Sequence, residues 1–309
     1  MPFIGLHIHK TAGTSVLRYL ERHAPSRLYG AYALRNFRLL ELPLWASANL
    51  TSRDIFWGHA IYESFFYDVA EPVRLFTFLR DPTERIVSWY SMLKRRKKLK
   101  KSAISLEAFA TAHSNSMCRM LVMRFPSLVE DQSALLSDQA MAVLEKMGFV
   151  GFQCHYSDHF TQLLEWMRVP ICTQTLGARH NTAKKSSALD LEDQALLQRL
   201  NDQDHRLYAL AYERYGAQPL HPERQLLMDS LISMANVDRA AIRQKQLKAA
   251  QKKFVSSLRF SLGDVGMESY VRRLNDSFGA CERVLDKALK RSYNIIEASV
   301  EDDKSGSDD

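Results

Sequence analysis

The first twenty residues constrain the fold more than any other stretch, because an apolar run leads directly into a turn of small and hydroxyl-bearing residues. Residues 3 to 8 are predicted to form a buried strand, and the apolar pattern of a helix begins at Val16. Between them, Lys10-Thr-Ala-Gly-Thr-Ser15 offers successive backbone N–H groups, three hydroxyls and one ammonium. At the N-terminus of a helix, where the helix dipole is positive, such a turn is typical of a phosphate-binding loop.

The order of residues in this turn differs from the common nucleotide-binding loop, Gly-x-x-x-x-Gly-Lys-Ser/Thr. Lys10 precedes Gly13, the glycine of the turn, whereas in the common loop the lysine directly follows a glycine. An ordinary ATPase loop is therefore a poor match, although a bound phosphate group is still expected.

Two later apolar runs end in side chains suited to chemistry. Residues 55 to 58 form a short apolar run that ends at His59, and residues 73 to 79, Arg74 apart, form a nearly continuous apolar run that ends at Arg80. Continuous apolar runs are typical of central parallel strands that are covered on both faces. Because ligands in open α/β sheets bind beyond the carboxyl ends of the strands, His59 and Arg80 become candidate site residues.

The segment after Arg80 predicts a helix that can share a ligand with it. Asp81 can cap this helix, and Pro82 suits its first position. Ser88 lies about two turns into the helix, so its hydroxyl and the Arg80 guanidinium can converge on one phosphate.

The other predicted elements carry no evident chemistry. Residues 29 to 50 indicate a mixed helical stretch, residues 103 to 147 helices, residues 149 to 152 a short buried strand and residues 160 to 167 an amphipathic helix. The stripe of residues 200 to 215, which includes Asp204, indicates a helix that packs on the core. The helices of residues 103 to 147 are expected to bury Leu106, Phe109, Leu121, Val122, Leu135, Leu136, Met141, Val143 and Leu144.

Taken together, the motifs resemble those of sulfotransferases that use 3′-phosphoadenosine 5′-phosphosulfate (PAPS). The Lys10 loop is similar to their 5′-phosphosulfate loop, and the segment from Arg80 to Ser88 looks like their 3′-phosphate motif. Trp57-Gly-His-Ala60 is similar to the segment that carries the catalytic base in glycan 2-O-sulfotransferases of the heparan sulfate type. The resemblance implies transfer of a sulfuryl group to an acceptor hydroxyl, with His59 as the general base and Lys10 stabilising the charge that develops.

The resemblance also implies which residues hold PAPS as co-substrate. A basic loop at residues 179 to 186 resembles the Arg-x-x-Thr-x-Lys-Lys loop of the same enzymes. No metal is expected, since lysine and backbone amides supply the positive field. The expected PAPS-binding residues are Lys10, Thr11, Ala12, Gly13, Thr14, Ser15, Arg80 and Ser88, with Arg179, Asn181, Thr182, Lys184 and Lys185 as secondary candidates.

The charge of the chain favours anionic partners. The formal net charge is +7, and seven of the eight residues from 94 to 101 are cationic. This run could be a solvated basic face, a nucleic-acid-binding patch or a surface that attracts a polyanionic acceptor. With the motifs before it, a saccharide, glycan or glycolipid acceptor is the preferred interpretation, and no nucleic acid is expected.

The expected architecture is an α/β fold with a mostly parallel sheet flanked by helices, as in P-loop-like sulfotransferases. Residues 1 to 218 would form the sulfotransferase domain, residues 219 to 300 a helical extension suited to pairing subunits, and residues 301 to 309 an acidic disordered tail. No stretch approaches 18 consecutive apolar residues, so no transmembrane segment is expected. We expect a cytoplasmic chain, or one of the Golgi lumen if an N-terminal anchor has been removed.

Two other function classes stay open. A P-loop-type small-molecule kinase would explain the strand, loop and helix, but the chain lacks the glycine-lysine order and an obvious acidic strand end for magnesium. A noncatalytic polyanion-binding protein would explain residues 94 to 101, but it would leave Lys10, His59 and Arg80 without a common purpose.

Overall fold

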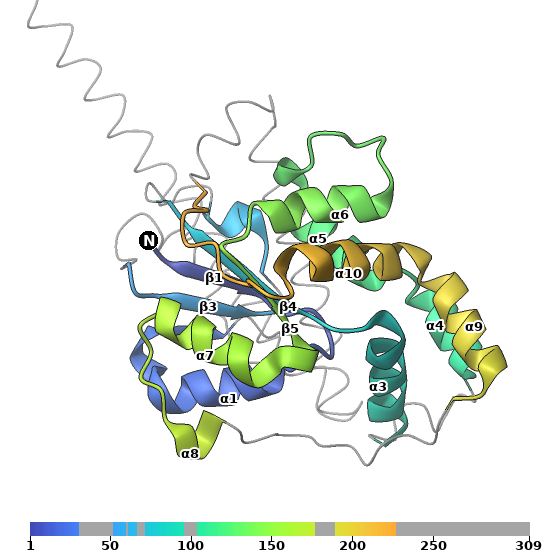
Figure 1. Ribbon diagram of the computed structural model, residues 1–309, viewed down its shortest axis with the longest axis horizontal. Coiled ribbons are helices and arrows are strands. Elements are labelled where there is room, and N and C mark those ends of the chain that lie inside the picture. Colours follow the sequence, from blue (N-terminus) through green and yellow to red (C-terminus); the bar gives the residue numbers. More distant parts are fainter. Residues whose placement is uncertain (31–51, 60, 67–71, 96–103, 177–188, 227–309) are drawn as a thin grey trace, which may run out of the picture.

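The computed structural model describes residues 1–30, 52–59, 61–66, 72–95, 104–176 and 189–226 (Figure 1). These residues contain a sheet of five parallel strands. The strand order is β2-β3-β1-β4-β5, so the first strand of the chain lies in the middle. All four pairings are parallel, which confirms the predicted α/β class with a parallel sheet. The strands are β1 (Phe3–Leu6), β2 (Leu28–Gly30), β3 (Ile55–Gly58), β4 (Arg74–Leu79) and β5 (Phe149–Phe152).

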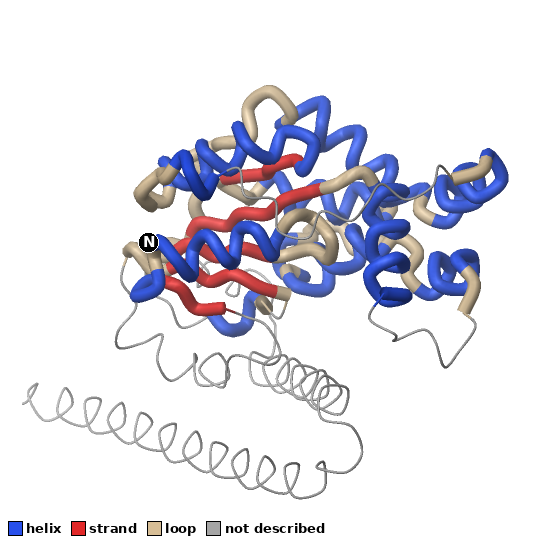
Figure 2. The backbone as a smooth tube through the Cα atoms, turned by 90° about the horizontal axis from the view of Figure 1, so that it is seen from below, coloured by secondary structure: helices blue, strands red, loops and turns tan. Residues whose placement is uncertain are grey.

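Helices cover both faces of the sheet (Figures 1 and 2). On one face lie α1 (Gly13–His23), α7 (Tyr156–Trp166) and the short α8 (Thr173–Leu176), which pack with an aromatic-rich cluster of strand residues. On the other face lie α5 (Ser116–Arg124), α6 (Leu136–Glu145) and α10 (Asp202–Tyr215). This layering explains why the strands are nearly continuous apolar runs, because both of their faces are buried.

A third group of helices lies beyond the carboxyl end of β4. It comprises α3 (Pro82–Arg95), α4 (Leu106–Ala112) and α9 (Leu191–Leu200), which share a small apolar cluster around Ile86 and Phe109 (Figure 1). As predicted, α3 begins at Pro82, and the Asp81 carboxylate accepts the Glu84 backbone N–H at 2.9 Å. The 3₁₀ turns are η1 (Pro25–Arg27), η3 (Glu63–Phe66), η4 (Pro126–Leu128) and η5 (Gln153–His155).

Gly5 lets two aromatic rings meet over the central strand. Its register partners are Trp57 on β3 and Phe76 on β4, whose rings stack 5.3 Å apart with an interplanar angle of 5°. A Cβ atom at Gly5 would overlap both rings. The glycine therefore allows Trp57 to reach across the sheet toward the segment that follows β1.

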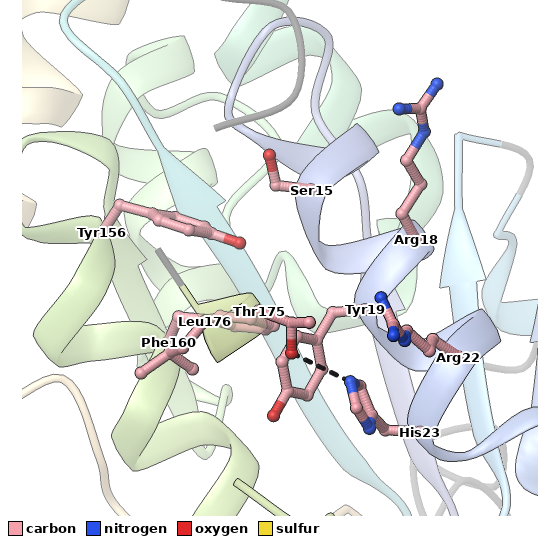
Figure 3. A pocket seen from close by; sticks show the side chains of 9 residues that line it. All are labelled: Ser15, Arg18, Tyr19, Arg22, His23, Tyr156, Phe160, Thr175 and Leu176. Carbon is pink, nitrogen blue, oxygen red and sulfur yellow. Dashed lines mark hydrogen bonds between the residues drawn. The ribbon is translucent and has the colours of Figure 1, made fainter. Parts of the chain in front are cut away.

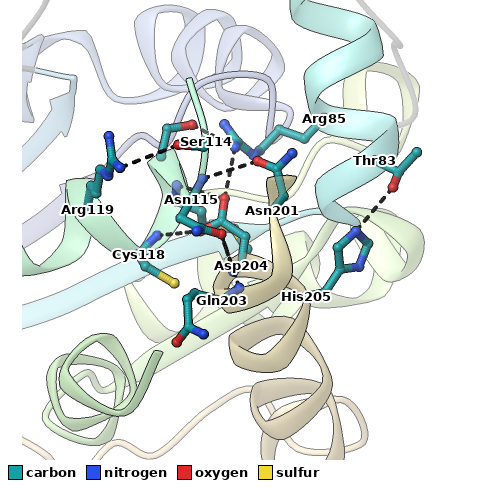
Figure 4. Close-up of polar contacts among 12 residues, drawn as sticks. Thr83, Arg85, Ser114, Asn115, Cys118, Arg119, Asn201, Gln203, Asp204 and His205 are labelled. Carbon is teal, nitrogen blue, oxygen red and sulfur yellow. Dashed lines mark hydrogen bonds and ion pairs between the residues drawn. The ribbon is translucent and has the colours of Figure 1, made fainter. Parts of the chain in front are cut away.

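A buried polar cluster joins α3, α5 and α10 (Figure 4). The Asp204 carboxylate on α10 accepts the N–H groups of Met117 and Cys118 in the first turn of α5, at 3.0 and 2.8 Å. In return, the Asn115 side chain before α5 accepts the N–H groups of Gln203 and Asp204 at 3.1 Å each. The two helices therefore cap one another, so that buried donors at both helix starts are satisfied.

Arg85 of α3 completes this cluster. Its Nη2 lies 3.0 Å from Asp204 Oδ2 and donates to Ser116 Oγ at 2.8 Å, and the Arg85 and Asp204 side chains are 1% and 0% exposed. Burial lowers the pKa of Arg85, and the Asp204 carboxylate acts in the opposite direction. The helix that carries Ser88 is thus anchored to α5 and α10 by a buried ion pair.

Two predictions about local structure are wrong, and a third group of predictions concerns residues that the structure does not describe. The strand β2 falls at the start of a stretch predicted to be helical; it is a three-residue edge strand, too short to give a clear period. Leu135, predicted to be buried, is instead 51% exposed at the position directly before α6. The C-terminal residues from 227 onward, the basic residues 96 to 101 and the secondary candidates Arg179, Asn181, Thr182, Lys184 and Lys185 lie outside the described residues.

Candidate active site

The segment between β1 and α1 is a tight turn with two residues in the left-handed region. Lys10 has φ of 71° and Ala12 has φ of 66°, and the buried Thr11 hydroxyl donates to the Ile8 carbonyl at 2.9 Å. The Thr11 hydroxyl, expected to face a phosphate, therefore holds the turn together instead. Within the described part of the chain, no side chain caps α1. The Ser15 N–H donates to the Ala12 carbonyl at 2.9 Å, so the N–H groups of Gly13 and Thr14 are the candidates for binding an anion at this helix start.

Gly13 is the point where α1, β1 and β3 meet. Its carbonyl accepts the Trp57 indole N–H at 3.1 Å, and the His7 ring lies where a Cβ atom would stand. Any side chain at this position would displace His7 or the helix start. The glycine is needed here for close packing, since its φ is not in the left-handed region.

His59 follows β3 and is fastened to the same turn. Its Nδ1 lies 2.5 Å from the His7 carbonyl oxygen, and a carbonyl can only accept a hydrogen bond. Nδ1 must therefore carry the proton, and in the neutral ring Nε2 holds the lone pair. This tautomer is the one in which Nε2 can accept a proton from a hydroxyl.

Five rings form a continuous stack around His59, and we call it the ring column. It runs Trp57, His7, His59, His9, Trp89, with successive centroid distances of 5.2, 4.0, 4.0 and 4.6 Å and interplanar angles of 14°, 23°, 3° and 8°. Burial lowers the pKa of His7 well below 6.5, and the charges of His59, His9 and Lys10 lower it further. His7 and His9 were not predicted as site residues, although a His-x-His pattern directly precedes Lys10.

Arg80, at the end of β4, reaches the same turn from the other side of β1. Its Nη1 donates to the Lys10 carbonyl at 3.4 Å, while Nε and Nη2 bind the Glu84 carboxylate at 3.2 and 3.1 Å. The Lys10 ammonium lies 3.7 Å from the Met92 sulfur on α3. Ser88, partly buried on α3, directly precedes Trp89 of the ring column.

The predicted residues of the first half of the chain thus gather at one edge of the sheet. Lys10, His59 and Arg80 follow the neighbouring strands β1, β3 and β4, and His59 and Arg80 both hydrogen-bond to backbone carbonyls of the turn after β1. This edge is the carboxyl edge, where open α/β sheets bind ligands.

A cavity of about 70 Å³ lies beside α1 and was not foreseen from the sequence (Figure 3). Ser15 and Tyr156 stand at one end, and a 3.0 Å hydrogen bond between His23 Nε2 and the Thr175 hydroxyl lies at the other. Two arginines of α1 make its rim basic. The lining residues are Ser15, Arg18, Tyr19, Arg22, His23, Tyr156, Phe160, Thr175 and Leu176.

The described residues contain neither a metal-binding cluster nor a membrane-spanning helix. No group of three or more histidine, cysteine, aspartate or glutamate side chains in these residues is arranged to hold a metal ion. None of the helices formed by these residues combines the length and the apolar character needed to cross a membrane.

Comparison with known proteins gives similarity in structure. No protein-family model matches the chain, and no curated protein matches it. Among solved structures, the chain is similar to a sulfotransferase from Alicyclobacillus acidocaldarius, with 16% identity over 69% of this chain and 96% of that chain, and a TM-score of 0.38. With so low a TM-score, the fold class rests on the sheet described above, and the function rests on the geometry of the site.

Proposed function

We propose that this protein is a sulfotransferase that moves a sulfuryl group from PAPS to an acceptor hydroxyl. The observation that carries the proposal is that the Lys10 turn, His59 and Arg80 follow three adjacent parallel strands, and that His59 and Arg80 each hydrogen-bond to a backbone carbonyl of the turn. An anion-binding turn, a base in the correct tautomer and a second cationic group are the three parts that this reaction needs.

In this proposal, the turn after β1 binds the 5′-phosphosulfate end of the donor. Lys10 and the first N–H groups of α1 face the anion, with Thr14 and Ser15 as the available hydroxyls of the turn. Arg80 and Ser88 bind the 3′-phosphate, and Arg80 would exchange part of its contact with Glu84 for the phosphate.

PAPS would supply the sulfuryl group and leave as adenosine 3′,5′-bisphosphate. His59 Nε2 takes the proton of the acceptor hydroxyl as the acceptor oxygen bonds to sulfur, and the bond from sulfur to the 5′-phosphate oxygen breaks. Lys10 and the turn amides stabilise the negative charge that grows on that phosphate. No step requires a metal ion, because these groups already supply positive charge.

The proposed acceptor class is based on the charge at the end of α3. Lys94 and Arg95 are exposed at the end of α3, the helix that carries Ser88 and Trp89. They begin the basic run of residues 94 to 101, so an acidic saccharide or glycolipid is the proposed acceptor.

The first test separates the base from the donor site. The His59→Ala variant should lose sulfuryl transfer while it binds adenosine 3′,5′-bisphosphate as the unaltered protein does, measured by calorimetry. His155→Ala is a matched control. His155 lies just after β5 and shares a hydrogen bond with Tyr212 of α10, and none of its described ring contacts is with the ring column. Retained turnover in His59→Ala would exclude His59 as the base.

The second test concerns the 3′-phosphate. Replacing Arg80 by Ala removes a charge-assisted contact of about 1.5–3 kcal/mol, so binding of adenosine 3′,5′-bisphosphate should weaken by about tenfold to a hundredfold, and binding of adenosine 5′-monophosphate much less. Equal losses for both nucleotides would contradict the assignment.

The alternatives make different predictions in the same calorimeter. A small-molecule kinase would bind ATP in a magnesium-dependent manner and would not prefer adenosine 3′,5′-bisphosphate. A noncatalytic polyanion-binding protein would bind heparin or DNA with strong salt dependence and neither nucleotide.

A further inference from the structure

The position of His59 between two other histidines is not explained by the proposed reaction alone. The His59 ring is nearly parallel to His9, at 3°, and its two faces contact His7 and His9 at the same centroid distance of 4.0 Å. On its outer side, His9 stacks on Trp89 of α3 at 4.6 Å. His59 is therefore held on both faces and, through Nδ1, at one edge.

We propose that His9 is a positioning residue, which clamps the His59 ring against His7 and connects it to α3 through Trp89. This inference rests on the proposed function, in which His59 is the base. Rotation of the His59 ring would break the Nδ1 bond and both ring contacts together. The clamp therefore keeps Nε2 in one direction before the acceptor binds, and such fixed geometry is what makes a general base effective.

A histidine at position 9 also differs from an apolar ring because it can carry charge next to His59. Among the described residues, the rings of His7 and His9 face His59, and the Lys10 ammonium and the Arg80 guanidinium belong to the same turn region. His113, at the end of α4, lies beyond Trp89 at 4.3 Å. A proton on any of these basic groups would disfavour a proton on His59, which is an effect that an apolar ring at position 9 could not have.

The test compares two substitutions of His9 in the full-length protein. His9→Phe keeps a flat ring between His59 and Trp89 but removes the titratable group, whereas His9→Ala removes the ring. Histidine side-chain NMR of the free protein reports the titration midpoint and the tautomer of His59, and steady-state kinetics report the pH profile. His155→Phe is the control, because His155 also stacks on an aromatic ring, Tyr212, but lies at the end of β5.

In His9→Phe, the His59 titration midpoint and the acidic limb of the kcat profile should both move to higher pH, with kcat largely kept at its new optimum. In His9→Ala, the Nδ1-protonated tautomer should lose its dominance and kcat should fall by about tenfold to a hundredfold, with little change in the KM for the donor. The control should match the unaltered protein in every measurement.

The outcomes separate this inference from the proposed function. If His59 titrates and keeps its tautomer identically in all His9 variants, the positioning role of His9 is wrong, even if His59→Ala abolishes sulfuryl transfer. If the His59 signals change as expected but no acceptor receives a sulfuryl group from PAPS, the clamp stands and the proposed function fails. His9→Phe keeps the test decisive if His9→Ala does not fold.

Discussion

The buried Asp204 carboxylate offers the sharpest test of how the helices that support the site are held. Three donors converge on its two oxygens: the Arg85 guanidinium and the N–H groups of Met117 and Cys118, all within 3.0 Å. The Asp204→Asn substitution keeps the shape of the side chain but removes its charge and turns one acceptor into a donor. One of the three donors then faces an NH₂ group, and Arg85 becomes a buried charge without its carboxylate.

The expected cost follows from burial. Since both side chains are at most 1% exposed, water cannot replace the lost contacts. Removing one member of a buried ion pair destabilises a protein by about 3–5 kcal/mol. A typical free energy of unfolding is about 5–15 kcal/mol, so this is a large fraction of the total. For a domain of this size the melting temperature should fall by about 6–20 °C.

The same helix provides a matched control. Arg206 lies two residues further along α10 and pairs with Asp138 at 3.0 Å, but both side chains are at least 40% exposed. Removing such a surface pair by Arg206→Ala should cost less than about 1 kcal/mol. Urea denaturation of both variants, followed by circular dichroism, measures the difference. If Asp204→Asn is no less stable than Arg206→Ala, the buried pair does not hold α3 to α5 and α10.

Three further predictions follow from packing and burial. Gly13→Ala should weaken binding of adenosine 3′,5′-bisphosphate in calorimetry, because the new Cβ displaces the His7 ring and the start of α1; unchanged binding would remove the need for glycine there. Burial lowers the pKa of His159 below 6.5, so the unfolded chain binds more protons than the folded protein as the pH drops through that value. The urea concentration at the unfolding midpoint should therefore decrease when the pH is lowered from about 7 to about 5.5, and it should decrease less in the His159→Gln variant. The buried Cys118 thiol, whose pKa is raised by burial, should resist iodoacetamide in the native protein while the exposed Cys154 reacts, as peptide mass spectrometry can show; equal labelling would contradict the described burial.

The sheet could be predicted from the sequence because its strands are buried on both faces. The continuous apolar runs at residues 3 to 8, 55 to 58 and 73 to 79 correspond to β1, β3 and β4, and residues 149 to 152 match β5 in both bounds. His59 and Arg80 directly follow two of these runs, so in a parallel sheet both lie at the carboxyl edge. An edge strand such as β2 has only three residues and gives no comparable signal.

The contacts within the site could not be predicted, because they join segments far apart in the chain. The ring column brings together His7 and His9, His59, and Trp89, which become neighbours only when β1, β3 and α3 are assembled. Arg85 and Asp204 are separated by 119 positions, and Asp204 was interpreted as part of a packing stripe. A carboxylate within an apolar helical stripe was the available signal for a buried ion pair.

The central place of β1 has a consequence for the order in which the protein can fold during synthesis. β1 leaves the ribosome before β3 and β4, the two strands with which it pairs, so its backbone groups lack these partners until residues 55 to 79 have also emerged. The Pro2 carbonyl accepts the Arg74 N–H at 2.9 Å, so this residue also lacks its partner until β4 has been synthesised. During that interval the strand Phe3–Leu6 is an exposed apolar edge, a natural substrate for a nascent-chain chaperone.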